Sequence, residues 1–222
     1  MAAENADFSG FTGELFQYFF DISINNSRAR YEEIKPLYRR AVRGPLLALC
    51  SALAPRMLSL DQSICVAPAR CVSGAYNDLR YHPAEPLKRY CYLHFCAQAA
   101  REEDIPGFFL EGGAQGCRLG LRVYHGTTAG MRKIREAMLD APDAFLAALP
   151  APGRFETAGE CFKRPPYPDA PESLRPWLSR KTVSLLRDMP NDALLAPDLP
   201  DALFDDFSRL SPLYHFWLSA LR

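Results

Sequence analysis

The chain has 222 residues, of which 48% are apolar and 23% charged, a composition typical of a folded soluble protein. Lys plus Arg and Asp plus Glu number 26 each, so the formal net charge is zero. No overall positive field is present to gather nucleic acid or an anionic membrane surface, so neither partner is expected and any anion binding must be local.

The cysteines and the start of the chain favour a cytoplasmic location. None of the seven cysteines forms a Cys-x-x-Cys pair, and the four histidines do not join them at zinc spacing, so no metal site is predicted. The start, MAAENADFSGF, lacks the features of a secretion signal. The longest apolar stretch, residues 45–55, is well short of the ~20 residues that span a bilayer. We expect free thiols, no membrane span and no cofactor.

Two helices are expected first. Residues 11–25 carry apolar side chains at helical spacing after Thr12, a plausible N-cap. Ser27 can cap a second helix over roughly 28–53. Pro36 and the Gly44-Pro45 pair predict that this helix is kinked or broken in two, and Pro55 is expected just after its end.

The middle of the chain predicts strands. Residue types that favour strands are enriched in four segments, residues 63–72, 88–98, 107–112 and 116–125. The sequence GGAQG at 112–116 predicts a hairpin turn between the last two. Apolar and polar residues alternate along the last strand, which predicts an antiparallel sheet with one face against helices and one partly polar.

Helices return after Gly126. Thr127 or Thr128 can cap a helix over about 129–139, and a short helix is expected at 142–149. An irregular, proline-rich loop follows at 150–172, then a helix or a strand and helix over 171–189, an acidic turn, and a closing helix at 201–221. The prediction is a single α+β domain over 1–222, in which a central antiparallel sheet of about four or more strands is packed by N-terminal and C-terminal helices.

The turn YNDLRYHPAEPLKRY, residues 76–90, is the first candidate site. Pro83 and Pro86 stiffen it, so its side chains are held in place at a low cost in chain entropy. Asp78 and Arg80 are two residues apart, and an ionised Asp beside an Arg can orient the guanidinium toward a phosphate or carboxylate. The alternative is a surface salt bridge.

The second candidate lies at the end of the last strand. Arg122 and Tyr124 share its polar face, and Gly126–Thr128 lead into a helix N-terminus, where free N–H groups attract anions. Arg132, Lys133 and Arg135 follow on that helix. The alternative is that the threonines are helix caps and the basic residues form a solvated face.

Several segments resemble the bacterial family known as domain of unknown function 2461. They are FTGELFQYFFDISINNSRARYEEIKP, GFFLEGGAQGCRLGLRVYHGTTAGMRKIRE, LRPWLSRK and PLYHFWL. The family hallmark is an Arg-Asp followed by an Arg-aromatic pair, then a basic residue and a tyrosine. Asp78, Arg80 and Tyr81 match it, whereas Asn77 replaces the first Arg, so this chain carries a degraded version.

The resemblance implies a fold and a site but no reaction, because the family has none assigned. It implies that residues far apart in the chain line one basic pocket beside the sheet, namely Asp78, Arg80, Lys88, Arg122, Tyr124, Arg135 and Lys181. We expect a small anionic or phosphate-bearing ligand there, with Arg80 as its main contact.

Two other functions stay open. The first is a hydrolase or transferase acting on a phosphorylated compound, with Asp78 or His125 as the base, although no catalytic residue can be assigned. The second is a protein-interaction module in which the aromatic C-terminal helix offers a partner surface formed by Phe204, Phe207, Tyr214 and Trp217.

Overall fold

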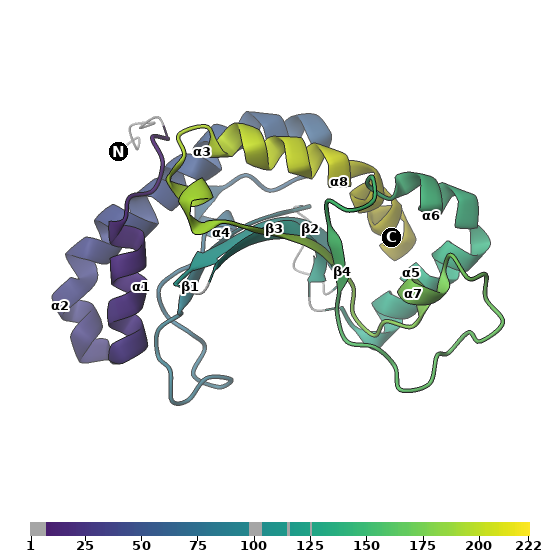
Figure 1. Ribbon diagram of the computed structural model, residues 1–222, viewed down its shortest axis with the longest axis horizontal. Helices are drawn as coiled ribbons and strands as arrows, with labels where there is room; N and C mark the ends of the chain where they lie inside the picture. Colours follow the sequence, from purple (N-terminus) through teal and green to yellow (C-terminus); the bar gives the residue numbers. More distant parts are fainter. Residues whose placement is uncertain (1–7, 98–103, 115, 125) are drawn as a thin grey trace. The chain divides into compact units, whose positions relative to one another are not determined.

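The computed structural model describes residues 8–97, 104–114, 116–124 and 126–222. It confirms the predicted α+β class, because helices precede and follow a five-stranded antiparallel sheet of order β1-β2-β3-β5-β4 (Figure 1). The strands are β1 (Tyr90–Cys96), β2 (Ile105–Gly113), β3 (Gly116–Tyr124), β4 (Glu156–Ala158) and β5 (Ser184–Met189). In β4 and β5, Glu156 pairs with Leu186 and Ala158 with Ser184.

The chain forms two compact units. The first comprises Met1–Phe95, Leu110–Leu119 and Asp188–Phe204, and the second comprises Cys96–Phe109, Gly120–Arg187 and Asp205–Arg222. Strands β1, β2, β3 and β5 each contribute residues to both units. The single-domain organisation over 1–222 stays a prediction.

The first unit begins with helices. They are α1 (Glu14–Ile24), α2 (Arg28–Tyr38), the π-helical η1 (Arg39–Arg43), α3 (Gly44–Leu60) and α4 (Pro68–Cys71), and the 3-10 helix η2 (Asn191–Leu195) comes late in the chain. Ser27 caps α2 as predicted, since its side chain accepts a hydrogen bond from the Arg30 amide at 3.2 Å. The predicted interruption of the second helix is also confirmed, because η1 separates α2 from α3.

Some predicted boundaries in this unit are wrong. Helix α1 starts after Gly13 without a side-chain cap, so Thr12 does not cap it. Pro55 lies inside α3, which runs on to Leu60, because the buried apolar side of α3 continues through Met57.

The core of the first unit is aromatic. Helices α1 and α2 lie side by side (Figure 1), and the ring centroids of Tyr18 and Tyr38 are 5.3 Å apart. Tyr31 packs against Tyr38 at 5.7 Å and against Tyr76 at 5.1 Å. These contacts place the 76–90 turn next to the helical part of the unit.

The predicted strand at 63–72 is wrong. Pro68 opens the short helix α4, since its fixed φ suits a first helical position and its missing N–H cannot join a ladder. Val72 forms one isolated bridge to Leu93.

The predicted hairpin turn is also shorter than GGAQG, because Gly112 and Gly113 belong to β2. Residues 98, 115 and 125 lie outside the described residues.

The second unit contains the later helices, namely α5 (Thr128–Asp140), α6 (Pro142–Ala148), α7 (Arg175–Leu178) and most of α8 (Leu199–Leu221). Phe145 of α6 packs against Trp177 at 5.2 Å and against Phe216 at 5.4 Å. Gly120 allows close approach of two strands, because an added Cβ would lie 1.9 Å from the Leu185 carbonyl oxygen.

Helix α8 is mostly buried on its aromatic side. Phe207, Tyr214 and Trp217 are each 0% exposed, and Phe108 of β2 packs against the first two of these at 5.3 and 4.9 Å. These three residues therefore offer no partner surface, whereas Phe204, the fourth residue of the expected surface, is half-buried, so the interaction module stays a prediction. Across the described parts of the chain, no helix has both the length and the apolar character needed to cross a bilayer.

Candidate functional site

The 76–90 turn holds the predicted Asp78–Arg80 pair. Arg80 Nη2 lies 2.6 Å from Asp78 Oδ2, and Arg80 Nε lies 3.0 Å from Asp78 Oδ1. Hydrogen bonds from the Arg80 side chain and backbone lower the pKa of Asp78 to about 2. The Arg80 side chain is 81% exposed, so the oriented guanidinium lies at the surface of the first unit.

Other polar groups of this turn bind its own backbone. The Asn77 amide donates to the carbonyl oxygens of Glu85 and Leu87 at 2.9 and 3.0 Å. The Lys88 ammonium donates to the Tyr76 carbonyl oxygen, and burial lowers the pKa of Lys88. Asn77, which replaces the hallmark Arg, therefore closes the turn, and Lys88 supports it from the opposite side of the isolated bridge between Tyr76 and Leu87.

The N-terminus of α5 is already occupied by an internal carboxylate. Asp104, whose φ is +72°, accepts hydrogen bonds from the Thr127 amide and, at 2.5 Å, from the Thr127 hydroxyl. Thr127 Oγ1 in turn accepts from the Gly130 amide at 3.1 Å, which confirms Thr127 as the helix cap. This helix end is therefore not an open anion site, and the role of Asp104 was missed in the sequence.

The remaining predicted residues lie in the second unit. Arg122 stacks over Phe109, with its Cζ 3.6 Å from the ring centroid. Lys181 forms an ion pair with the exposed Glu160. Arg135 is only 5% exposed, donates from Nη1 to the Arg180 carbonyl oxygen at 3.0 Å, and lies over the Phe162 ring. The side chain of Tyr124 lies outside the described residues.

The structure thus brings Arg135 next to the segment that contains Lys181, within the second unit. It joins Asp78, Arg80 and Lys88 in one turn of the first unit. The arrangement of one group relative to the other is not defined, so a pocket shared by all seven residues stays a prediction.

Three arginines of the second unit bind main-chain carbonyl oxygens. Arg135 donates to the carbonyl oxygen of Arg180. Arg180 donates to the carbonyl oxygens of Gly159 and Thr157 at 3.0 and 2.9 Å. Arg175 Nε donates to the carbonyl oxygen of Ala170 at 3.0 Å. No carboxylate in the described part of the chain pairs with any of the three. Buried Arg135 Nε and Arg180 Nε also lack a hydrogen-bond partner there. These three guanidiniums are therefore held by main-chain oxygens and not by ion pairs.

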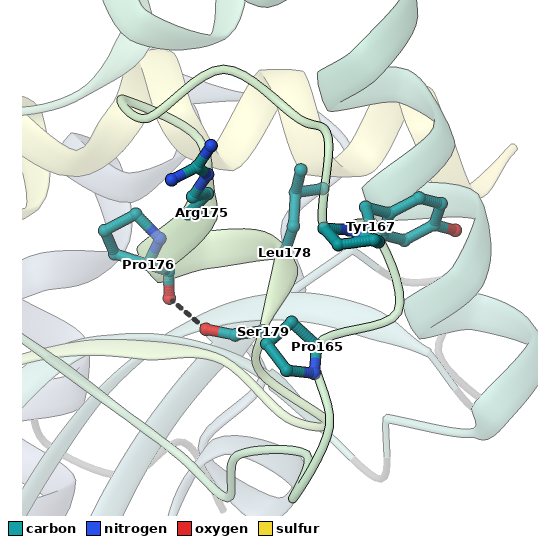
Figure 2. Close-up of a pocket in the computed structure, with 7 residues that line it drawn as sticks. Pro165, Tyr167, Arg175, Pro176, Leu178 and Ser179 are labelled. Carbon is teal, nitrogen blue, oxygen red and sulfur yellow. Dashed lines mark hydrogen bonds between the residues drawn. The ribbon is translucent and has the colours of Figure 1, made fainter.

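A pocket lies in the same part of this unit. Its volume is about 430 Å³, and it is lined by Pro165, Tyr167, Pro168, Arg175, Pro176, Leu178 and Ser179. In Figure 2, Arg175 and Pro176 lie on one side of Leu178, Tyr167 lies on the other, and Pro165 lies below it. Within the described residues, no group of three or more His, Cys, Asp or Glu side chains could hold a metal ion.

Arg175 and this pocket were not among the sequence predictions. The available signal was an arginine at the start of a short helix that follows a proline-rich loop. That pattern did not reveal the pocket, because the prolines were interpreted only as loop formers.

The five-stranded antiparallel sheet, the helices at both ends and the pocket after β4 define an α+β protein. Residues 14–216 match the family described as a conserved hypothetical protein (DUF2461), and the chain belongs to this family, as its resemblance predicted. No curated protein matches the chain. The family description names no ligand or reaction, so a function must be argued from the site.

Proposed function

We propose that the protein binds a small anionic or phosphate-bearing ligand in the pocket of the second unit, with Arg175 as its principal contact. The supporting observation is a guanidinium on the pocket wall that no carboxylate of the described residues neutralises. The Ala170 carbonyl oxygen holds Arg175 Nε, which leaves both Nη groups as a donor fork for a carboxylate or phosphate.

The surroundings of the pocket favour an anion. Residue Arg180 follows the lining residue Ser179, and Arg135 binds the Arg180 carbonyl oxygen. Their charges raise the local positive potential, and a buried charge without a carboxylate partner is stabilised when an anion binds nearby. A volume of about 430 Å³ also lies within the usual range of about 300–1,000 Å³ for small-molecule sites.

The proposal is recognition without chemistry. Asp78 is a weak base near neutral pH, because its pKa is about 2 and its oxygens bind Arg80. His125, the other base considered, lies outside the described residues. Arg80 is a weaker candidate contact than Arg175, since its charge is balanced by Asp78.

Calorimetric titration with inorganic phosphate and pyrophosphate tests the proposal. Arg175→Met retains much of the aliphatic stem and removes the charge, so we expect at least tenfold weaker binding than in the parent. Arg164→Met is the matched control, because Arg164 is exposed, lies in the loop that precedes α7 and does not line the pocket. Equal binding by the parent and Arg175→Met would overturn the assignment.

A further inference from the structure

We infer that the ligand carries its anionic group on a flat aromatic ring, and that the ring occupies the pocket while the anion binds Arg175. This inference rests on the proposed function. Of the seven lining residues, three are prolines, one is a leucine and one is a tyrosine. The other two, Arg175 and Ser179, are polar. The pocket therefore has one charged wall and a mainly apolar interior.

A bare phosphate does not match these walls. Besides Arg175, the donor side chains of the lining are the hydroxyls of Tyr167 and Ser179, and the Ser179 hydroxyl already donates to the Pro176 carbonyl oxygen at 3.4 Å. A phosphate bound to Arg175 would leave its remaining oxygens facing proline rings and Leu178, which offer few donors to replace the lost water. A ligand whose charge is confined to one end avoids this penalty.

The shape of the pocket favours a ring over a flexible chain. In Figure 2, Pro176 lies to the left of Leu178, Tyr167 to its right and Pro165 below it. Pyrrolidine rings fix the backbone φ, so these walls need little ordering when a ligand binds. A rigid ring also loses little conformational entropy, and it can stack on Tyr167.

The size of the pocket is sufficient for a substituted ring. An engineered apolar cavity of about 150 Å³ holds benzene. The volume of about 430 Å³ leaves room for one ring together with a carboxylate or phosphate substituent. Leu178, which is 1% exposed, provides a fixed apolar contact for the ring.

Paired ligands separate the ring from the anion. Calorimetry with benzoate and acetate compares the same carboxylate with and without a ring, and phenyl phosphate and inorganic phosphate form the second pair. We expect at least tenfold tighter binding for the aromatic member of each pair. Arg175→Met should weaken binding of all four ligands.

Variants of Tyr167 test the stacking contact. Tyr167→Ser should reduce the advantage of benzoate over acetate at least threefold and leave phosphate binding unchanged, whereas Tyr167→Phe should retain the advantage. Tyr81→Ser is the matched control on the exposed turn of the first unit, and it should change neither ratio. Equal melting temperatures of Tyr167→Phe and the parent would show that the fold tolerates changes at this position.

The outcomes distinguish the two proposals. If phosphate binds through Arg175 but benzoate binds no better than acetate, the aromatic ligand class is wrong and the anion site stands. If none of the four ligands binds, the proposed function itself is wrong. Benzoate binding that survives Arg175→Met would show that ring and anion contacts are not coupled, which also overturns the inference.

Discussion

Arg135 of α5 donates a hydrogen bond to the carbonyl oxygen of Arg180, 3.0 Å away. Arg180 in turn binds the carbonyl oxygens of Thr157 and Gly159, at β4 and just after it. The two arginines thus link α5 to the segment that precedes the pocket and to the residues that follow it. They combine positive charge with a structural role.

Arg135→Lys should lower the free energy of unfolding by about 1–3 kcal/mol, measured by urea denaturation. A lysine can offer a donor to residue 180, but it lacks the planar guanidinium that lies over Phe162. Arg132→Lys on the same helix is the control, because Arg132 is 66% exposed, and its change should stay within about 0.5 kcal/mol. Equal effects of the two substitutions would contradict this role.

Asp206→Asn should strongly lower the free energy of unfolding, because Asp206 is a buried charged residue of the second unit. The Asp206 carboxylate is 0% exposed and lies 2.5 Å from both Arg154 Nε and Arg187 Nη2. Loss of its charge leaves the Arg187 guanidinium without its counter-ion and leaves Arg154 with only the exposed Asp205 at 3.6 Å, so we expect a decrease of about 3–5 kcal/mol in denaturation experiments.

Asp205→Asn is the matched control for Asp206→Asn. Asp205 is 53% exposed and pairs with Arg209 at 3.1 Å and more loosely with Arg154 at 3.6 Å, so its replacement should change stability by about 0–1 kcal/mol. A similar decrease for both variants would show that burial of Asp206 is not decisive.

The sequence predicted the elements whose periodicity is strong and local. The Ser27 cap, the α5 face of Met131, Ile134 and Met138, and the closing helix all follow from side chains a few residues apart. The strand predicted at 63–72 failed because β-forming residues there were weighted above Pro68, which starts α4. The three-residue strand β4 was missed, since it depends on pairing with β5 across the chain.

Site residues were harder to predict than helices. The local Asp78–Arg80 pair follows from a spacing of two residues. The hydrogen bond from Arg135 to the Arg180 carbonyl oxygen joins residues that are 45 positions apart. The hydrogen bond from Thr127 to Asp104 joins residues that are 23 positions apart. Such contacts are set by tertiary packing, so no local pattern in the sequence reveals them. The pocket was missed for the same reason.

Asp104→Gly should convert the N-terminus of α5 into an anion site. Glycine tolerates the φ of +72° at this position, and loss of the carboxylate leaves the Thr127 amide without its acceptor. We expect a loss of about 1–2 kcal/mol, and sulfate should raise the melting temperature of Asp104→Gly more than that of the parent. Equal sulfate effects on both proteins would argue against capping by Asp104.

Asp78 should titrate with a pKa of about 2 in carbon-13 NMR of the folded protein. Arg80→Gln should raise this pKa toward 3.8. Arg89→Gln removes the ion pair between Arg89 and Glu85 in the same turn and should leave the pKa of Asp78 unchanged. Because the folded pKa is lowered, the stabilisation is present above pH 3.8 and is lost as the pH falls toward 2. An unchanged Asp78 pKa in Arg80→Gln would contradict the assigned cause.

Anomalous diffraction from crystals soaked in selenate tests the central claim most directly. Selenate mimics phosphate and sulfate, and its selenium can be located without bias. The account predicts an anomalous peak in the pocket, with selenate oxygens within hydrogen-bond distance of the Arg175 guanidinium, and no such peak in Arg175→Met. A pocket without selenate in the parent, with peaks only at arginines away from the pocket such as Arg80, would contradict it.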